Sequence, residues 1–129
     1  MLFQIRDDDP RVIERLEELL RSMAAAATAQ GPCTVAVERL RTGAPAMMDP
    51  AFQNAIEAAS AALAGGRSIR MPSAAGHDAQ ILATIMPSGM MFVPSIGGIS
   101  HHWTENTADA DIVTGAQVFV DTCVRLLMR

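Results

Sequence analysis

The feature that most constrains the fold of this chain is the alternation of helical apolar stripes with short apolar runs. Across residues 10–30, apolar residues recur at the spacing of an amphipathic helix, and Asp9-Pro10 supplies an N-cap followed by a proline at the first helical position. Residues 33–37 alternate apolar and polar side chains, as a half-buried strand does. With a further short strand expected at residues 2–6, this part of the chain predicts a β-α-β unit.

A similar series of elements follows a break at residues 42–45. Asp49-Pro50 repeats the N-cap and proline pair, and Gly65-Gly66 marks the end of the helix that this pair begins. Strands are expected at residues 68–71 and 90–93, a short helix at 77–86, and a last helix capped by Thr107. We therefore predict an α/β fold with an incomplete mixed sheet and packed helices.

Charge and composition exclude several classes of partner. The net charge is −4 and no basic block is present, so a nucleic-acid partner is not expected. No apolar run approaches the roughly 20 residues that span a bilayer, and the first residues lack the features of a signal peptide. Cys33 and Cys123 lie in separate apolar patterns, which predicts two reduced, buried thiols in a cytoplasmic protein. Because an incomplete sheet leaves edges unpaired, a homo-oligomer is expected.

The three histidines lie in loops that contain glycine. His77 follows Gly76, and His101 and His102 follow the stretch Gly97–Ser100. A loop between a strand and a helix often carries chemistry, and a neutral imidazole is both a zinc ligand and a general base.

The residues alone leave simpler interpretations open. A single loop histidine is more often structural, and catalytic zinc needs about three protein ligands. Neighbouring side chains in an extended backbone point in opposite directions, so His102 is not expected to bind the same ion as His101. Glu105 is a candidate for a hydrogen bond that shapes the loop. An unrelated small α/β protein with structural histidines stays an alternative.

Three motifs in a fixed order nevertheless resemble one family. Their order and spacing resemble those found in the C-terminal part of the zinc-dependent amidohydrolases of the M20 peptidase superfamily. The nearest branch is the hydantoinase/carbamoylase group, which includes N-carbamoyl-L-amino-acid hydrolases, β-ureidopropionases and allantoate amidohydrolases. The motifs are Ser-Ala-Ala-Gly-His-Asp-Ala at residues 73–79, Met-Met-Phe-Val-Pro-Ser at 90–95, and Gly-Ile-Ser-His at 98–101 followed by Glu-Asn-Thr at 105–107.

The resemblance implies a division of the chain and a chemistry. Residues 1–45 would be the end of the family's lid and dimerisation domain, a β-α-β half of a ferredoxin-like fold, and residues 46–129 the C-terminal part of its catalytic domain. The family uses zinc, or another divalent metal such as manganese. Zinc-activated water cleaves the linear amide or ureido C–N bond of small N-carbamoyl or allantoate-like substrates.

Three residues acquire roles from the resemblance. His101 matches the family's last zinc ligand, and His77 matches a histidine that contacts the substrate near the scissile group. Arg6 resembles an arginine that holds the substrate carboxylate, a task that suits a forked guanidinium. Three positions depart from the family pattern: Gln4 replaces Asp, Ala74 replaces Gly, and Trp103 replaces Pro.

The family's other zinc ligands and its glutamate general base have no counterpart in this sequence. The resemblance therefore implies a C-terminal fragment that holds no catalytic residue of its own and is inactive alone. Whether such a fragment binds any metal is left open. The alternative is a non-catalytic truncated module that oligomerises or complements a missing N-terminal portion.

Overall fold

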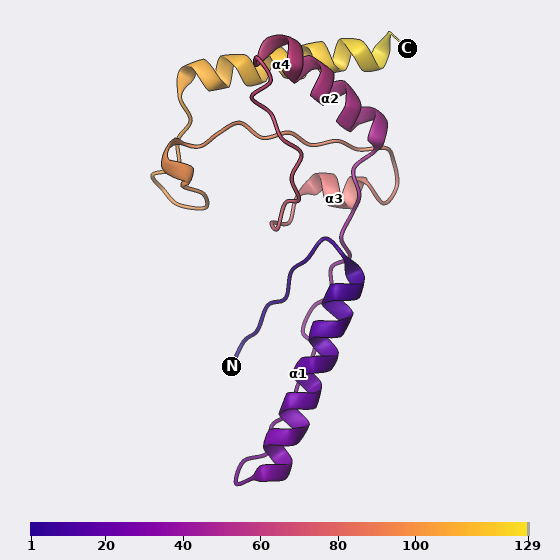
Figure 1. Ribbon diagram of the computed structural model, residues 1–129, viewed down its shortest axis with the longest axis vertical. Coiled ribbons are helices and arrows are strands. Elements are labelled where there is room, and N and C mark those ends of the chain that lie inside the picture. The colour runs from indigo at the N-terminus through magenta and orange to yellow at the C-terminus, as the bar shows by residue number, and fades with distance from the viewer. Residues whose placement is uncertain (129) are drawn as a thin grey trace. The chain divides into compact units, whose positions relative to one another are not determined.

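The computed structural model describes residues 1–128, and this part of the chain is helical (Figure 1). No residue in it forms a strand, so the predicted α/β fold with a mixed sheet is wrong, as is the β-α-β half of a ferredoxin-like domain. The elements are α1 (Pro10–Gln30), α2 (Pro50–Leu63), α3 (Asp78–Leu82), the short 3-10 helix η1 (Ile96–Gly98) and α4 (Asp109–Leu127).

In two of the segments predicted as strands, the hydrogen bonds observed are made by side chains rather than between neighbouring backbones. A strand requires N–H···O=C bonds to an adjacent segment. In residues 33–37, the Val35 N–H donates instead to Thr28 Oγ1 at 2.8 Å. In residues 68–71, Arg70 donates from its guanidinium to Asn54 Oδ1 at 2.8 Å. An alternating apolar pattern is therefore not sufficient for a strand when no partner segment aligns with it.

The chain forms two compact units. The first contains Met1–Ala46 together with Pro72–Gly76, and the second contains Met47–Met71 and the chain from His77 onward. In the first unit, α1 begins as predicted, because the Asp9 carboxylate accepts a hydrogen bond from the Arg11 N–H at 2.9 Å. The helix ends at Gln30 and is followed by its C-cap Gly31, whose φ of 52° suits glycine.

Glu17 joins α1 to the chain that follows it. Its carboxylate forms an ion pair with Arg39, which lies beyond the end of α1. It forms a second ion pair, at 2.8 Å, with Arg21 one helical turn away. Arg39 first, and then Arg21, hold the pKa of Glu17 below its ordinary value of 4.5. The predicted apolar face of α1 is covered only in part: Ala24 is buried, whereas Leu19 and Met23 are exposed to 54% and 61%.

We expect the Glu17 contacts to make the order of the first unit depend on pH. Because its pKa is lowered in the folded chain, the carboxylate stabilises this unit fully above pH 4.5 and loses that effect as the pH falls through the lowered pKa. Amide protection of residues 33–40, expressed relative to the intrinsic exchange rate at each pH, should therefore fall in acid in the wild type and change less with pH in Glu17→Gln. Identical pH profiles in the two proteins would contradict this assignment, and added salt should weaken the wild-type effect.

In the second unit, α2 packs against α4 through small residues (Figure 1). Ala55 and Ala59 of α2 are buried, and Val118 and Thr122 of α4 lie buried as well. The Thr122 hydroxyl donates to the Val118 carbonyl at 2.7 Å, so its burial leaves no unpaired donor.

Hydrophobic spacing predicts a buried stripe on α4 that includes Phe119 and Val120, and this prediction is wrong in part. Phe119 and Val120 are exposed to 58% and 61%, whereas the contact face contains Gly115, Val118 and Thr122. A pattern that follows hydrophobicity alone misses a face on which glycine and threonine permit close approach.

Residues 88–95 lie against both helices and lead toward the histidine loop. The Asp49 N–H donates to the Ser88 carbonyl at 2.8 Å. A Cβ added at Gly89 would lie 2.7 Å from Phe52 Cβ, and one added at Gly115 would lie 2.3 Å from Val93 Cγ1. Glycine is therefore needed at both contacts, and together they fix the path by which the chain enters the loop.

The start of α2 is stabilised by a side-chain N-cap, Asp49. Asp49 accepts hydrogen bonds from the N–H groups of Ala51 at 2.7 Å and Phe52 at 3.4 Å. Asp49→Ala should reduce the free energy of unfolding by about 1 kcal/mol, measured by urea denaturation, whereas Asp49→Asn should retain most of it. Equal losses in the two variants would show that the side-chain cap is not the cause.

The start of α4 differs from the prediction. Its N-cap is Ala108, which offers no side-chain hydrogen bond, so Thr107 does not cap the helix. Asp109 and Asp111 lie in the first turn and Arg125 lies in the last turn, where the sign of each charge favours the helix dipole. Among the described residues, no helix is both long and apolar enough to cross a membrane.

Candidate functional site

The loop from Ile96 to Asn106 is closed at its neck. The Ile96 N–H donates to the Asn106 carbonyl at 2.8 Å, which joins the two ends of the loop. Within it, η1 turns the chain through Gly97 and Gly98, both with φ of 68°. The loop is thus a compact structure tied by its own backbone, placed between residues 88–95 and α4.

His101 has an uncommon backbone conformation. Its φ of 57° lies in the left-handed region, which is uncommon for a residue with a side chain. The His101 N–H donates to Glu105 Oε2 at 2.7 Å, which confirms that Glu105 forms a hydrogen bond that shapes the loop. The His101 side chain is exposed, and no hydrogen bond from another described residue reaches its imidazole.

His102 makes contacts that separate it from His101. Its Nδ1 lies 2.8 Å from Thr104 Oγ1, and its ring centroid lies 5.6 Å from that of Trp103. One ring nitrogen of His102 is thus occupied within the loop. Its exclusion as a co-ligand stays a prediction, and these contacts are consistent with it.

His77 lies immediately before α3 in the same unit as the loop. It is half-buried, and its ring centroid lies 5.4 Å from that of Phe92, with the planes inclined by 55°. The sequence did not indicate this contact, because Phe92 is in a run that resembled a core strand. Phe92 links His77 to the segment that enters the histidine loop.

Arg6 belongs to the first unit, whereas His77 and His101 belong to the second. Its guanidinium Nη1 donates to the Ala74 carbonyl, within Pro72–Gly76. The side chain is exposed, and among the described residues no carboxylate forms an ion pair with it. The guanidinium is therefore bonded to Ala74, within the motif at residues 73–79 that contains His77. It retains N–H donors for an anion.

The described residues do not gather a complete metal site. In residues 1–128, no group of three His, Cys, Asp or Glu side chains is placed to hold an ion. Cys33 and Cys123 are both free, as predicted, but neither is buried: Cys33 is exposed and Cys123 is half-buried. His101 fits the part of one ligand, with an accessible imidazole on a tied loop, while a zinc site needs about three.

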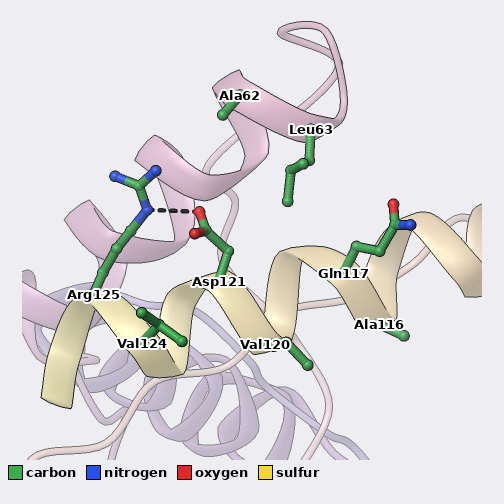
Figure 2. Close-up of a pocket in the computed structure, with 8 residues that line it drawn as sticks. All are labelled: Ala62, Leu63, Ala116, Gln117, Val120, Asp121, Val124 and Arg125. Carbon is green, nitrogen blue, oxygen red and sulfur yellow. Dashed lines mark hydrogen bonds and ion pairs between the residues drawn. The ribbon is translucent and has the colours of Figure 1, made fainter. Parts of the chain in front are cut away.

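A separate open groove of about 540 Å³ lies between α2 and α4 (Figure 2). Leu63 points into it from α2, and the Arg125 guanidinium pairs with Asp121 at 2.6 Å on α4. None of the three histidines lines it. The groove is therefore not part of the candidate site.

Comparison with known proteins places the chain in context. The sequence matches Peptidase family M20/M25/M40 over residues 6–125. It is 30% identical over 125 residues to an N-carbamoyl-L-amino acid amidohydrolase of Geobacillus stearothermophilus, covering 97% of this chain and 30% of that protein. It is 51% identical over 47 residues to the allantoate amidohydrolase of Escherichia coli (strain K12), covering 36% of this chain and 11% of that protein.

A solved structure shows the same relation in three dimensions. The crystal structure of an amidase of the hydantoinase/carbamoylase family from Burkholderia phymatum matches with a TM-score of 0.78 and 32% sequence identity. The match covers 93% of this chain and 28% of the amidase. The chain thus spans less than a third of the length of these relatives.

Proposed function

The chain belongs to peptidase family M20/M25/M40, as its motifs predicted, and we propose that it forms part of a metal-dependent amidohydrolase. The bond to be cleaved is a linear amide or ureido C–N bond, in an N-carbamoyl amino acid or an allantoate-like molecule. Relatives named for N-carbamoyl-L-amino acids and for allantoate support this substrate class.

The observation that carries the proposal is the presentation of His101. The closed loop and the Glu105 hydrogen bond hold an exposed imidazole whose nitrogens are not taken by other described residues. Bound there, zinc or another divalent metal such as manganese would act as a Lewis acid. Because one imidazole is too few, we propose that the other ligands come from a part of the enzyme outside this chain.

Two further residues are proposed to bind substrate. The half-buried His77, held against Phe92, is proposed to contact the group next to the scissile bond. Arg6 can grip a substrate carboxylate with the guanidinium nitrogens that its bond to Ala74 leaves available. No residue of this chain is proposed as the general base.

The division into residues 1–45 as the end of a lid and dimerisation domain and 46–129 as part of the catalytic domain is likewise proposed. Two free cysteines suit a reducing compartment, and we propose the cytoplasm.

A second candidate is a non-catalytic module that oligomerises or complements the rest of an amidohydrolase. The exposed apolar side chains of α1 and α4 favour it, since uncovered faces of this kind mark association surfaces. The two candidates share the family and differ in what the chain does by itself.

We expect the isolated chain to associate and to be inactive. With added Zn²⁺ or Mn²⁺ it should release no product from an N-carbamoyl-L-amino acid, because the described residues offer too few ligands. In sedimentation it should form dimers or larger species, and Leu19→Glu with Met23→Glu should reduce the average mass. Turnover by the isolated chain would contradict the incomplete site, and a monodisperse monomer would contradict the association.

A further inference from the structure

We propose that Glu105 is a positioning residue for His101, an inference that rests on the metal-ligand role proposed for His101. Glu105 Oε2 accepts the His101 backbone N–H at 2.7 Å, a short bond to an ionised oxygen. Bonds of this kind are about twice as strong as neutral ones. The carboxylate therefore acts on the backbone from which the imidazole projects, and not on the imidazole itself.

The conformation of His101 explains why such a contact matters. At φ of 57°, a residue with a side chain is disfavoured unless its surroundings hold it. Glycine would adopt this conformation freely but would offer no imidazole. The Glu105 contact lets a histidine occupy a position that backbone geometry would otherwise give to glycine.

Glu105 is itself held in place from two directions. Its N–H donates to the His102 carbonyl at 2.9 Å, and the next residue, Asn106, closes the neck of the loop with Ile96. The Glu105 side chain thus extends from a fixed backbone, and its carboxylate reaches the His101 N–H four positions earlier in the chain. A fixed donor and a fixed acceptor lose little further freedom when the bond forms.

A second side-chain hydrogen bond in the loop does not involve His101. Thr104 Oγ1 meets His102 Nδ1 at 2.8 Å and leaves His101 untouched. Thr104→Val therefore provides a matched control that removes a loop hydrogen bond of similar length. Glu105→Gln provides a conservative variant, because its amide oxygen can still accept the His101 N–H.

The first measurement is amide exchange of His101 by NMR in the metal-free full chain. In the wild type this amide should exchange at least about tenfold more slowly than in an unstructured peptide, and Glu105→Ala should remove that protection. Glu105→Gln should retain part of it and Thr104→Val all of it. An unprotected wild-type amide, or protection unchanged in Glu105→Ala, would overturn the proposal.

The second measurement titrates Zn²⁺ into the Burkholderia phymatum amidase in which this chain replaces the segment that it matches, and follows the imidazole nitrogens of His101. The hybrid is needed because the orientation of one imidazole affects Zn²⁺ affinity only where other ligands hold the same ion. Glu105→Ala should weaken the response at least about tenfold in Zn²⁺ concentration, with partial rescue in Glu105→Gln, while circular dichroism shows an unchanged helix content. Equal Zn²⁺ responses in the wild type and Glu105→Ala would overturn positioning. No response in any variant would overturn the metal role of His101 in this chain, and amide exchange would still decide whether Glu105 positions it.

Discussion

Replacing His101 by alanine should remove hydrolysis from an enzyme that contains this chain in a complete site. The suitable enzyme is the Burkholderia phymatum amidase in which this chain replaces the segment that it matches, since the two share 32% identity and a TM-score of 0.78. Activity toward an N-carbamoyl-L-amino acid should fall by at least about 100-fold, because loss of a metal ligand costs more than loss of a group that orients one. Bound zinc, measured by elemental analysis, should fall in parallel.

His102→Ala provides the matched control for this result. His102 is adjacent and is engaged by Thr104 at 2.8 Å, so its loss should disturb the loop without removing a ligand. We expect His102→Ala to retain both the zinc content and most of the activity. A loss of zinc in His102→Ala but not in His101→Ala would reverse the assignment of the ligand.

Gly115→Ala should destabilise the second unit by about 1–3 kcal/mol, the usual effect of an overfilled contact. The added Cβ would lie 2.3 Å from Val93 Cγ1, which is closer than real Cβ contacts, so the Val93 side chain or the helix must shift. The sign is informative, because alanine in place of glycine within an exposed helix stabilises by close to 1 kcal/mol. Urea denaturation of the full chain measures the difference.

A second substitution isolates the cause. Val93→Ala removes Cγ1, the atom that the added Cβ would approach. In a protein that already contains Val93→Ala, the further change Gly115→Ala should therefore cost much less stability than it costs in the wild type. Gly43→Ala, which meets no atom within 4 Å, serves as the control for a glycine without a contact. A stabilised Gly115→Ala would show that Val93 does not pack against α4 as described.

The starts of α1 and α2, unlike that of α4, could be predicted because their signals are local. Asp9-Pro10 and Asp49-Pro50 each place the cap, the proline and the receiving N–H groups within a single turn. The structure confirms both helix starts. The end of α1, with Gly31 as its C-cap, follows from the same kind of short-range information.

Strands and burial could not be predicted, because both depend on distant parts of the chain. The alternation at residues 33–37 has no partner backbone and is held by Thr28 instead. The contact face of α4 contains Gly115 and Thr122, whose suitability depends on Val93 and on a hydrogen bond within the helix. The spacing of hydrophobic residues in the sequence indicates neither the missing partner segment nor the contact face of α4.

The candidate site was predicted through motifs rather than through geometry. The resemblance selected His77 and His101, and Glu105 was expected to shape the loop, as it does. The contact of His77 with Phe92 joins residues fifteen positions apart in sequence and leaves no local signal. The bond from Arg6 to Ala74 joins positions 68 apart and was equally invisible.

The most direct test of the central claim compares the isolated chain with the same chain inside the Burkholderia phymatum amidase. The measurement is hydrolysis of an N-carbamoyl-L-amino acid in the presence of Zn²⁺ or Mn²⁺, with gel filtration and circular dichroism to show that the hybrid is folded. The proposal predicts no turnover by the isolated chain and metal-dependent turnover by the hybrid that His101→Ala abolishes. A folded hybrid whose turnover survives His101→Ala would contradict it.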